Sequence, residues 1–230
     1  MKPAFWARRV HKWVGLVVGV QALFWMISGV YMTVVSLDVI HGDHLAHAST
    51  DALTTSSDWI APDALSSRYP GLTSYRAKQL LGRDVLEVHQ GKRVALVDAV
   101  TGKQISPLEK TAVRALAVSL YQGDAQVRDV AWIEKAPQEV ATRPVPLWAV
   151  RFADSGDTTL YFSPHSGELL ARRHSLWRWF DFVWMFHIMD YESRTDVNNN
   201  LLRVAAGTGL LFALSGIWLL LYSFRRSTTA

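Results

Sequence analysis

The chain has 230 residues, of which 50% are apolar and only 19% are charged, and it contains ten tryptophans and no cysteine. Ordinary soluble domains have about 25% charged residues, so this composition favours a membrane protein. The lack of thiols excludes structural disulfides, iron–sulfur clusters and cysteine catalysis. The formal net charge is +4, and nothing in the charge pattern indicates a nucleic-acid partner.

The first predicted element is a transmembrane helix within residues 1–44. Its apolar part, from Trp13 to Leu37, has no charged residue, and a bilayer core about 30 Å thick is crossed by roughly 20 such residues in a helix. The alternative is a signal peptide, because basic residues precede the run and Ala46-His47-Ala48 looks like a cleavage site. However, a signal peptide has an apolar core of about 7–15 residues with the cleavage site near its end. The pattern therefore favours an uncleaved signal anchor.

Residues 45–172 are predicted to form a soluble α+β domain, which is large enough to fold without disulfides. Two apolar-periodic stretches, Ala61–Tyr69 and Leu108–Tyr121, predict helices. Short runs between turns predict strands at Ser74–Leu80, Asp84–His89, Val94–Val97, Val127–Ile133, Leu147–Phe152 and Thr158–Phe162.

The same domain carries a sign of internal duplication. The segments LVDAVTGKQIS and YFSPHSGELLA each contain a strand, a polar turn, a glycine and a resumed apolar stretch, with Gly102 and Gly167 at the matching position. The pattern indicates a duplicated unit, although strand–turn–glycine sequences are common in proteins.

Residues 173–202 are predicted to form a helix and a loop at the membrane surface. The stretch Leu176–Met189 is too short to span a bilayer, and its tryptophans favour the lipid–water interface. The last segment, 203–230, contains a second uncharged run from Val204 to Phe224, which predicts a second transmembrane helix. Ser28-Gly29 and Ser215-Gly216, one pair in each span, predict close packing between helices.

The basic residues predict the topology. Lys2, Arg8, Arg9 and Lys12 precede the first span, and Arg225 and Arg226 follow the second. Because loops rich in Lys and Arg stay in the cytoplasm, both termini are expected inside and the central domain outside. The predicted fold class is therefore an α+β membrane protein in which two transmembrane helices flank the central domain, with an interfacial helix before the second span.

Several motifs resemble those of a known family. Asp98-Ala-Val-Thr-Gly102-Lys and Ser163-Pro-His-Ser-Gly167-Glu are similar to the strand–turn segment of PepSY domains. The segments VHKWVGLVVGVQALFWMISGVYM, HGDHL, FHIMDY and FALSGIWLL resemble the membrane segments of PepSY-associated transmembrane proteins. The resemblance covers essentially the whole chain, and its transmembrane motifs are more specific than the PepSY match.

This family includes haem-b membrane reductases that act on ferric siderophores, and two-span forms found beside flavin reductase modules. The resemblance implies a bacterial inner membrane, a periplasmic PepSY-like domain and electron transfer through haem b. The larger reductases have four spans and this chain has two, so a four-helix bundle would require a homodimer or a partner membrane subunit. No dinucleotide or flavin motif is present, so electrons are expected from a flavin reductase or from quinol.

Histidine is the usual axial ligand of haem b, and three boundary histidines are the candidates. His11 opens the first span and shares a helix face with Gly15 and Gly19, which leave room for a flat porphyrin. The two glycines are equally a helix-packing motif, with His11 as an interfacial anchor, and the resemblance favours the ligand. His44 in HGDHL and His187 in FHIMDY lie at the outer boundary. His187 could equally be an interfacial histidine with ordinary polar partners, and the resemblance favours both residues as ligands.

Chain length constrains how these ligands pair. His11 and His44 are separated by about 50 Å along a mostly helical path, so one chain cannot place both on the same iron. His44 and His187 could share an outer haem. His11 would then pair with His11 of a second copy, in an inner haem site lined by Gly15 and Gly19.

Two other interpretations remain open. His41, His44 and His47 would share a stripe if the helix continued through them, and could then bind a divalent metal, although their spacing is no recognised zinc signature. PepSY domains also occur as inhibitory or binding units, so the chain could be a non-enzymatic binding, regulatory or assembly module. His89 and His165 are expected to be ordinary surface or pairing residues.

Overall fold

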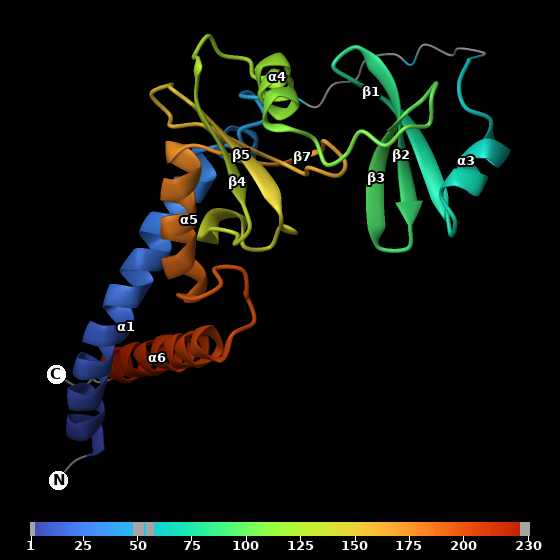
Figure 1. Ribbon diagram of the computed structural model, residues 1–230. Helices are drawn as coiled ribbons and strands as arrows, with labels where there is room; N and C mark the ends of the chain where they lie inside the picture. Colours follow the sequence, from blue (N-terminus) through green and yellow to red (C-terminus); the bar gives the residue numbers. More distant parts are fainter. Residues whose placement is uncertain (1–2, 48–52, 54–57, 226–230) are drawn as a thin grey trace. The chain divides into compact units, whose positions relative to one another are not determined.

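The computed structural model describes the main chain of residues 3–47, 53 and 58–225, and the side chains of 5–6, 9–47, 53 and 58–221. The basic residues Lys2 and Arg226, and the side chains of Arg8 and Arg225, lie outside this described part. The chain divides into two compact units, Met1–Leu37 with Trp179–Ala230, and Asp38–Arg178. Each unit is described by itself (Figure 1).

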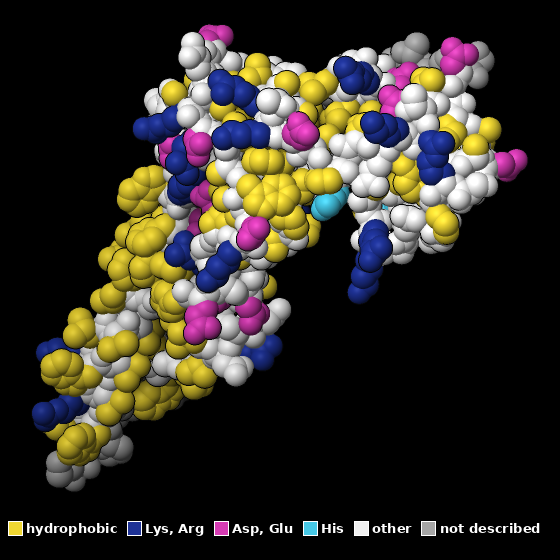
Figure 2. All heavy atoms as spheres, in the orientation of Figure 1, with side chains coloured by type: hydrophobic (Ala, Val, Ile, Leu, Met, Phe, Trp, Pro, Cys, Tyr) yellow, Lys and Arg dark blue, Asp and Glu magenta, His cyan; other side chains and the backbone are white. Residues whose placement is uncertain are grey.

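The first unit contains two long apolar helices, α1 (Pro3–Val34) and α6 (Asn200–Arg225). Their segments Arg9–Val34 and Asn200–Leu221 are long and apolar enough to cross a membrane, with mean hydropathies of 1.8 and 2.0. Their apolar side chains are largely exposed, and Figure 2 shows hydrophobic side chains along the α1 helix. Both predicted spans are confirmed, and the chain is a membrane protein with two apolar helices.

Helix α5 (Ser175–Ile188) begins in the second unit and ends in the first. A compact loop follows it, in which the Asp190 carboxylate accepts hydrogen bonds from the main-chain N–H groups of Glu192, Ser193, Thr195 and Asp196. The hydrogen bond from the Ser193 hydroxyl, followed by those from the N–H groups of Asp196, Thr195 and Ser193, lowers the pKa of Asp190. Asn199 Oδ1 then accepts the N–H of Leu202 at 2.8 Å and caps the first turn of α6.

The second unit starts with the short helix α2 (Leu37–His41), which ends where Gly42 takes a φ of +72°. The first half of the central domain then contains α3 (Pro62–Arg68) and an antiparallel sheet in the order β1-β2-β3. Its strands are Ser74–Leu80 (β1), Arg83–Gln90 (β2) and Arg93–Asp98 (β3). Leu65 of α3 packs with Leu86, Val88 and Val97 of this sheet.

The second half contains α4 (Lys110–Leu120) and an antiparallel sheet in the order β4-β5-β6-β7. Its strands are Val127–Ile133 (β4), Leu147–Phe152 (β5), Thr159–Phe162 (β6) and Leu169–Arg173 (β7), with a short 3₁₀ helix, η1, at Gln138–Val140. The periodic face of α4, with Val113, Ala117 and Leu120, is buried on β4 and β5. All six predicted strands and both predicted helices are present, within a few residues at their ends, and β7 and η1 were not predicted.

The two halves repeat one element order, α-β-β-β followed by a turn, and the turns have the same hydrogen bonds. Asp98 Oδ1 accepts the N–H groups two and three residues further on, at 3.1 and 2.7 Å. Ser163 Oγ does the same, at 3.3 and 3.1 Å. Gly102 and Gly167 end the turns with φ of +65° and +68°, and each donates its N–H to the carbonyl of the first turn residue, at 2.9 and 2.8 Å. The two halves therefore share one element order and one turn geometry, as a duplicated unit would.

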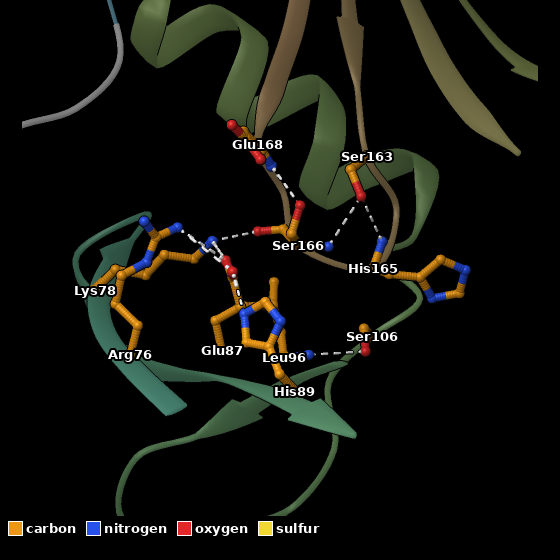
Figure 3. Close-up of polar contacts among 10 residues, drawn as sticks. All are labelled: Arg76, Lys78, Glu87, His89, Leu96, Ser106, Ser163, His165, Ser166 and Glu168. Carbon is orange, nitrogen blue, oxygen red and sulfur yellow. Dashed lines mark hydrogen bonds and ion pairs between the residues drawn. The ribbon is translucent and has the colours of Figure 1, made fainter. Parts of the chain in front are cut away.

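A buried carboxylate links the two halves (Figure 3). Glu87 on β2 is 4% exposed and accepts hydrogen bonds from Lys78 Nζ at 2.5 Å and His89 Nε2 at 2.9 Å. Lys78 also donates to the carbonyl of Ser166, in the turn of the second half, at 2.6 Å. Burial works to raise the pKa of Glu87, but the hydrogen bond and charge of Lys78, with Arg76 and His89, lower it below its ordinary value. His89 is thus a pairing residue.

Candidate functional site

His11 lies on α1 and is held by Phe212 and Ser215 of α6. Its Nδ1 is 2.8 Å from Ser215 Oγ, and its ring stacks on Phe212, with the ring centroids 4.2 Å apart and the planes inclined by 17°. The Cβ that an alanine at Gly216 would carry comes 3.6 Å from His11 Cε1. The packing of α1 against α6 predicted from Ser215-Gly216 is therefore confirmed, and the imidazole lies within it. The Ser28-Gly29 pair does not pack in this way, because Ser28 contacts His187 on α5 and a Cβ at Gly29 would meet no described atom within 4 Å.

His187, near the end of α5, is held in the same way by α1. Its Nδ1 is 2.7 Å from Ser28 Oγ, and its ring is parallel to that of Trp184 within 13°, at 6.1 Å between centroids. Trp25 donates its indole N–H to the main-chain carbonyl of His187 at 2.9 Å. His11 and His187 therefore have matching surroundings. In each, a serine on a neighbouring helix contacts Nδ1, and an aromatic ring lies nearly parallel to the imidazole.

In both imidazoles the hydrogen bond to the serine involves Nδ1, and the other ring nitrogen is Nε2. Among the described residues, none forms a hydrogen bond with Nε2 of His11 or of His187, and both side chains are partly exposed. An imidazole whose Nδ1 is fixed by the protein and whose Nε2 is open has the arrangement found in metal-ligating histidines. Each side chain can therefore offer one nitrogen to a ligand.

The two imidazoles lie at two different levels of α1. His11 is part of the helix, and His187 contacts it at Ser28. At a rise of 1.5 Å per residue these positions are about 25 Å apart along the helix axis. The two nitrogens therefore belong to two separate sites.

The two glycines predicted to leave room for a porphyrin differ from each other. A Cβ at Gly15 would come 2.9 Å from Phe212 Cζ, so the space above this glycine is taken by the ring that stacks on His11. A Cβ at Gly19 would meet none of the described atoms within 4 Å. Gly15 therefore contributes to helix packing, while Gly19 faces open space, and their role toward a porphyrin stays a prediction.

Two apolar grooves lie along α1 and α6. The groove that includes His11 and Phe212 has a volume of about 330 Å³. The other has a volume of about 580 Å³ and is lined by apolar side chains together with the amide of Gln21 and the hydroxyl of Thr208. Gln21 donates weakly to the carbonyl of Phe186, at 3.4 Å.

His44 belongs to the second unit, where its ring meets His174 edge to face with the centroids 6.0 Å apart. His174 is buried and donates Nε2–H to the carbonyl of Ile40 at 3.1 Å. Burial lowers the pKa of His174, although the bond to Ile40 opposes this effect. The pairing of His44 with His187, which belongs to the other unit, stays a prediction.

A metal site on His41, His44 and His47 required one helix to continue through all three residues. This condition is not met, because the helix ends at His41. The positive φ of Gly42 turns the chain there. Among the residues that the structure describes, no three His, Cys, Asp or Glu side chains are placed to hold a metal ion.

Sequence reasoning missed the serines. Ser28 and Ser215 were predicted only as small residues for helix packing, and each proves to hold an imidazole. A hydroxyl within an otherwise apolar span tends to face a partner, and this signal could have identified both serines. The identity of the partner depends on contacts between segments far apart in the chain.

A search of the curated proteins finds no match to the chain. One family model matches residues 8–230, which is nearly the whole sequence, and its description is PepSY-associated TM region. Since this match includes both apolar helices and the duplicated α+β domain between them, the chain belongs to the PepSY-associated transmembrane family.

Proposed function

We propose that this protein binds haem b in a bacterial inner membrane and passes single electrons across that membrane. The observation that carries the proposal is the matching arrangement of His11 and His187. Each imidazole is held through Nδ1 by a serine on a neighbouring helix and leaves Nε2 open, and the two lie about 25 Å apart along α1.

The residues around His11 and His187 suit a bound haem b. Haem b is held without cysteine, through axial histidines, and the chain has no cysteine. His11 lines a groove of about 330 Å³ between α1 and α6, and the open space at Gly19 lies further along the same helix face. His11 and His187 would be the axial ligands.

At the His11 site this chain supplies one histidine. A second axial ligand would come from a second copy, as His11 paired with His11, or from a partner membrane subunit. His44 is proposed as the second ligand beside His187. Only 6% of the residues in the most apolar segment of α1, and none in that of α6, are buried. Both helices therefore have exposed surface for such a partner.

Bound haem b would supply one-electron transfer, and the protein residues would fix its ligands and exclude water. The chain has no dinucleotide or flavin motif, so the proposed donors are quinol or a flavin reductase. Ferric siderophores, or another periplasmic compound, are the proposed acceptors. With both termini in the cytoplasm, the duplicated domain would lie in the periplasm.

The experiment is a difference spectrum, dithionite-reduced minus air-oxidised, of the full-length protein purified from cells supplied with haem. We expect the Soret and α bands of a b-type haem. His11→Ala and His187→Ala should each lose part of the absorbance, and the double variant should lose all of it. His165→Ala is the control, because His165 is an exposed turn residue in the duplicated domain and should retain the full spectrum.

A colourless wild-type protein would overturn the proposal, and so would full haem retention in the double variant. The first result would favour the alternative function, a membrane-anchored binding, regulatory or assembly module built on the duplicated domain. In that case the purified protein should carry a stoichiometric protein partner in place of the cofactor.

A further inference from the structure

The two serines that hold the imidazoles have further hydrogen-bond partners in their own helices, and these partners determine where the protons are. Ser28 Oγ donates to the main-chain carbonyls of Phe24, at 2.7 Å, and Trp25, at 3.0 Å. Ser215 Oγ donates to the carbonyl of Phe212, at 2.7 Å. A serine hydroxyl has one hydrogen, so this hydrogen is used within the serine's own helix.

The same count assigns the hydrogen on each imidazole. A carbonyl oxygen has no hydrogen to give, so the 2.7 Å contact between Ser28 Oγ and the Phe24 carbonyl requires the serine hydrogen. The hydrogen between Ser28 Oγ and His187 Nδ1 therefore belongs to the imidazole. By the same argument, His11 donates Nδ1–H to Ser215 Oγ.

We infer that Ser28 and Ser215 are positioning residues, which hold His187 and His11 as the Nδ1–H tautomer and keep the Nε2 lone pair free for a ligand. Neutral histidine in water favours the opposite tautomer, in which Nε2 carries the hydrogen and cannot bind iron. The serines, fixed by their own helices, reverse this preference before any ligand arrives.

The choice of a hydroxyl has a chemical consequence. A carboxylate that accepts Nδ1–H draws the proton toward itself and makes the imidazole a stronger donor. A serine oxygen, whose own hydrogen is used elsewhere, is a weaker and uncharged acceptor. The serine orients the ring and sets its tautomer without adding a charge to the apolar span, where a charge is costly.

The tautomer can be measured on the full chain without a cofactor. We would record the side-chain ¹⁵N shifts of histidine-labelled protein in detergent, at a pH where both imidazoles are neutral, and assign signals with His11→Ala and His187→Ala. Both residues should give the Nδ1–H pattern. Ser28→Ala should move His187 toward the Nε2–H pattern and leave His11 unchanged, and Ser215→Ala should do the converse.

Two further variants separate the hydrogen bond from packing. Ser28→Thr keeps the hydroxyl and should keep the tautomer of His187. Thr33→Ala is the matched control, because the Thr33 hydroxyl also bonds a carbonyl of α1, that of Val30 at 2.8 Å, and contacts no imidazole. It should change neither signal. A Nε2–H pattern in the wild type, or Ser→Ala variants that leave both tautomers unchanged, would overturn the inference.

The consequence for haem rests on the proposed function. Loss of such a supporting hydrogen bond typically weakens metal affinity by about 10–100-fold, so haem titration should show this loss for Ser28→Ala and Ser215→Ala, and not for Thr33→Ala. The two failures are distinct. A protein with the stated tautomers that binds no haem contradicts only the proposed function, and a haem protein whose tautomers ignore the serines contradicts only this inference.

Discussion

Trp25 donates its indole N–H to the main-chain carbonyl of His187 at 2.9 Å, one helical turn before Ser28, which holds the ring of the same histidine. The end of α5 is therefore attached to α1 through both its main chain and its side chain.

The indole bond can be removed while the aromatic ring is kept. Trp25→Phe leaves the His187 carbonyl without its donor, which costs about 1–3 kcal/mol when the acceptor is buried, so the detergent-solubilised protein should unfold at a lower temperature. Trp13→Phe is the control, because Trp13 is 62% exposed on the same helix and should leave the unfolding temperature unchanged. Equal unfolding temperatures for the two variants would contradict this role of Trp25.

The two glycines of α1 give a paired test of helix packing. Gly15→Ala would place a Cβ 2.9 Å from Phe212 Cζ and displace the ring that stacks on His11, with an overpacking cost of about 1–3 kcal/mol. In the described part of the chain, the Cβ of Gly19→Ala meets no atom within 4 Å, and the substitution gains up to about 1 kcal/mol of helix propensity. Thermal unfolding should therefore rank Gly15→Ala below the wild type and Gly19→Ala at or above it.

The haem content of the same two variants addresses a separate question. If Gly19 leaves room for a porphyrin, Gly19→Ala should lower haem content while the unfolding temperature of the haem-free protein does not fall. Unchanged haem content in Gly19→Ala would remove Gly19 from the proposed site and leave His11 as its ligand.

Much of the central domain was predictable because its signals are local. Short runs between turns predicted β1 to β6, and the turns at Asp98 and Ser163 each begin with a polar residue and have a glycine four residues further on. Strand β7 was missed because Leu169–Arg173 has no alternation, and its pairing with β6 is what makes it a strand. The first uncharged run in the sequence extends to Leu37, whereas α1 ends at Val34. Uncharged residues continue past the last helical turn, so the end of the run does not mark the end of the helix.

The candidate site was predictable only in part. The sequence indicated His11, His44 and His187 because they lie at the boundaries of the predicted spans and because the family resemblance favours them as ligands. It could not indicate which groups hold their rings, because Ser215 is 204 residues from His11 and Ser28 is 159 residues from His187. Such pairings are set by how α1, α5 and α6 pack, and helix periodicity alone leaves that packing open.

Glu87 should make the stability of the central domain depend on acid pH. Its pKa is lower in the folded protein than its ordinary value, because Lys78 above all outweighs the effect of burial. A lowered carboxyl pKa stabilises the folded state above the unfolded-state pKa, about 4.3, and this contribution is lost as the pH falls through the folded-state pKa.

Glu87→Gln should therefore lower the free energy of unfolding at neutral pH, and the difference from the wild type should shrink as the pH falls below about 4. Chemical denaturation of the full-length protein at a series of pH values measures this. Glu134→Gln, at an exposed position, is the matched control and should follow the wild-type curve. A Glu87→Gln difference that is constant with pH would show that the ion pair does not stabilise the fold.

The duplicated turns predict an order of damage for alanine substitutions at three glycines with similar positive φ. At Gly91, with a φ of +61°, no atom of the described residues lies within 4 Å of an added Cβ, so Gly91→Ala carries only the backbone strain, about 1–2 kcal/mol. At Gly167 the Cβ would also come 3.1 Å from Leu108 Cδ1 and Leu80 Cδ1, and at Gly102 it would overlap Ile60 Cδ1.

Unfolding free energies should therefore fall in the order Gly91→Ala, Gly167→Ala and Gly102→Ala, with overpacking adding about 1–3 kcal/mol to the strain at Gly102. Because the backbone strain is common to all three positions, the differences between them measure the packing around each turn. If Gly102→Ala and Gly167→Ala were no worse than Gly91→Ala, the two turns would be held by their hydrogen bonds alone. The duplication would then reflect a shared turn sequence, with no shared packing beneath it.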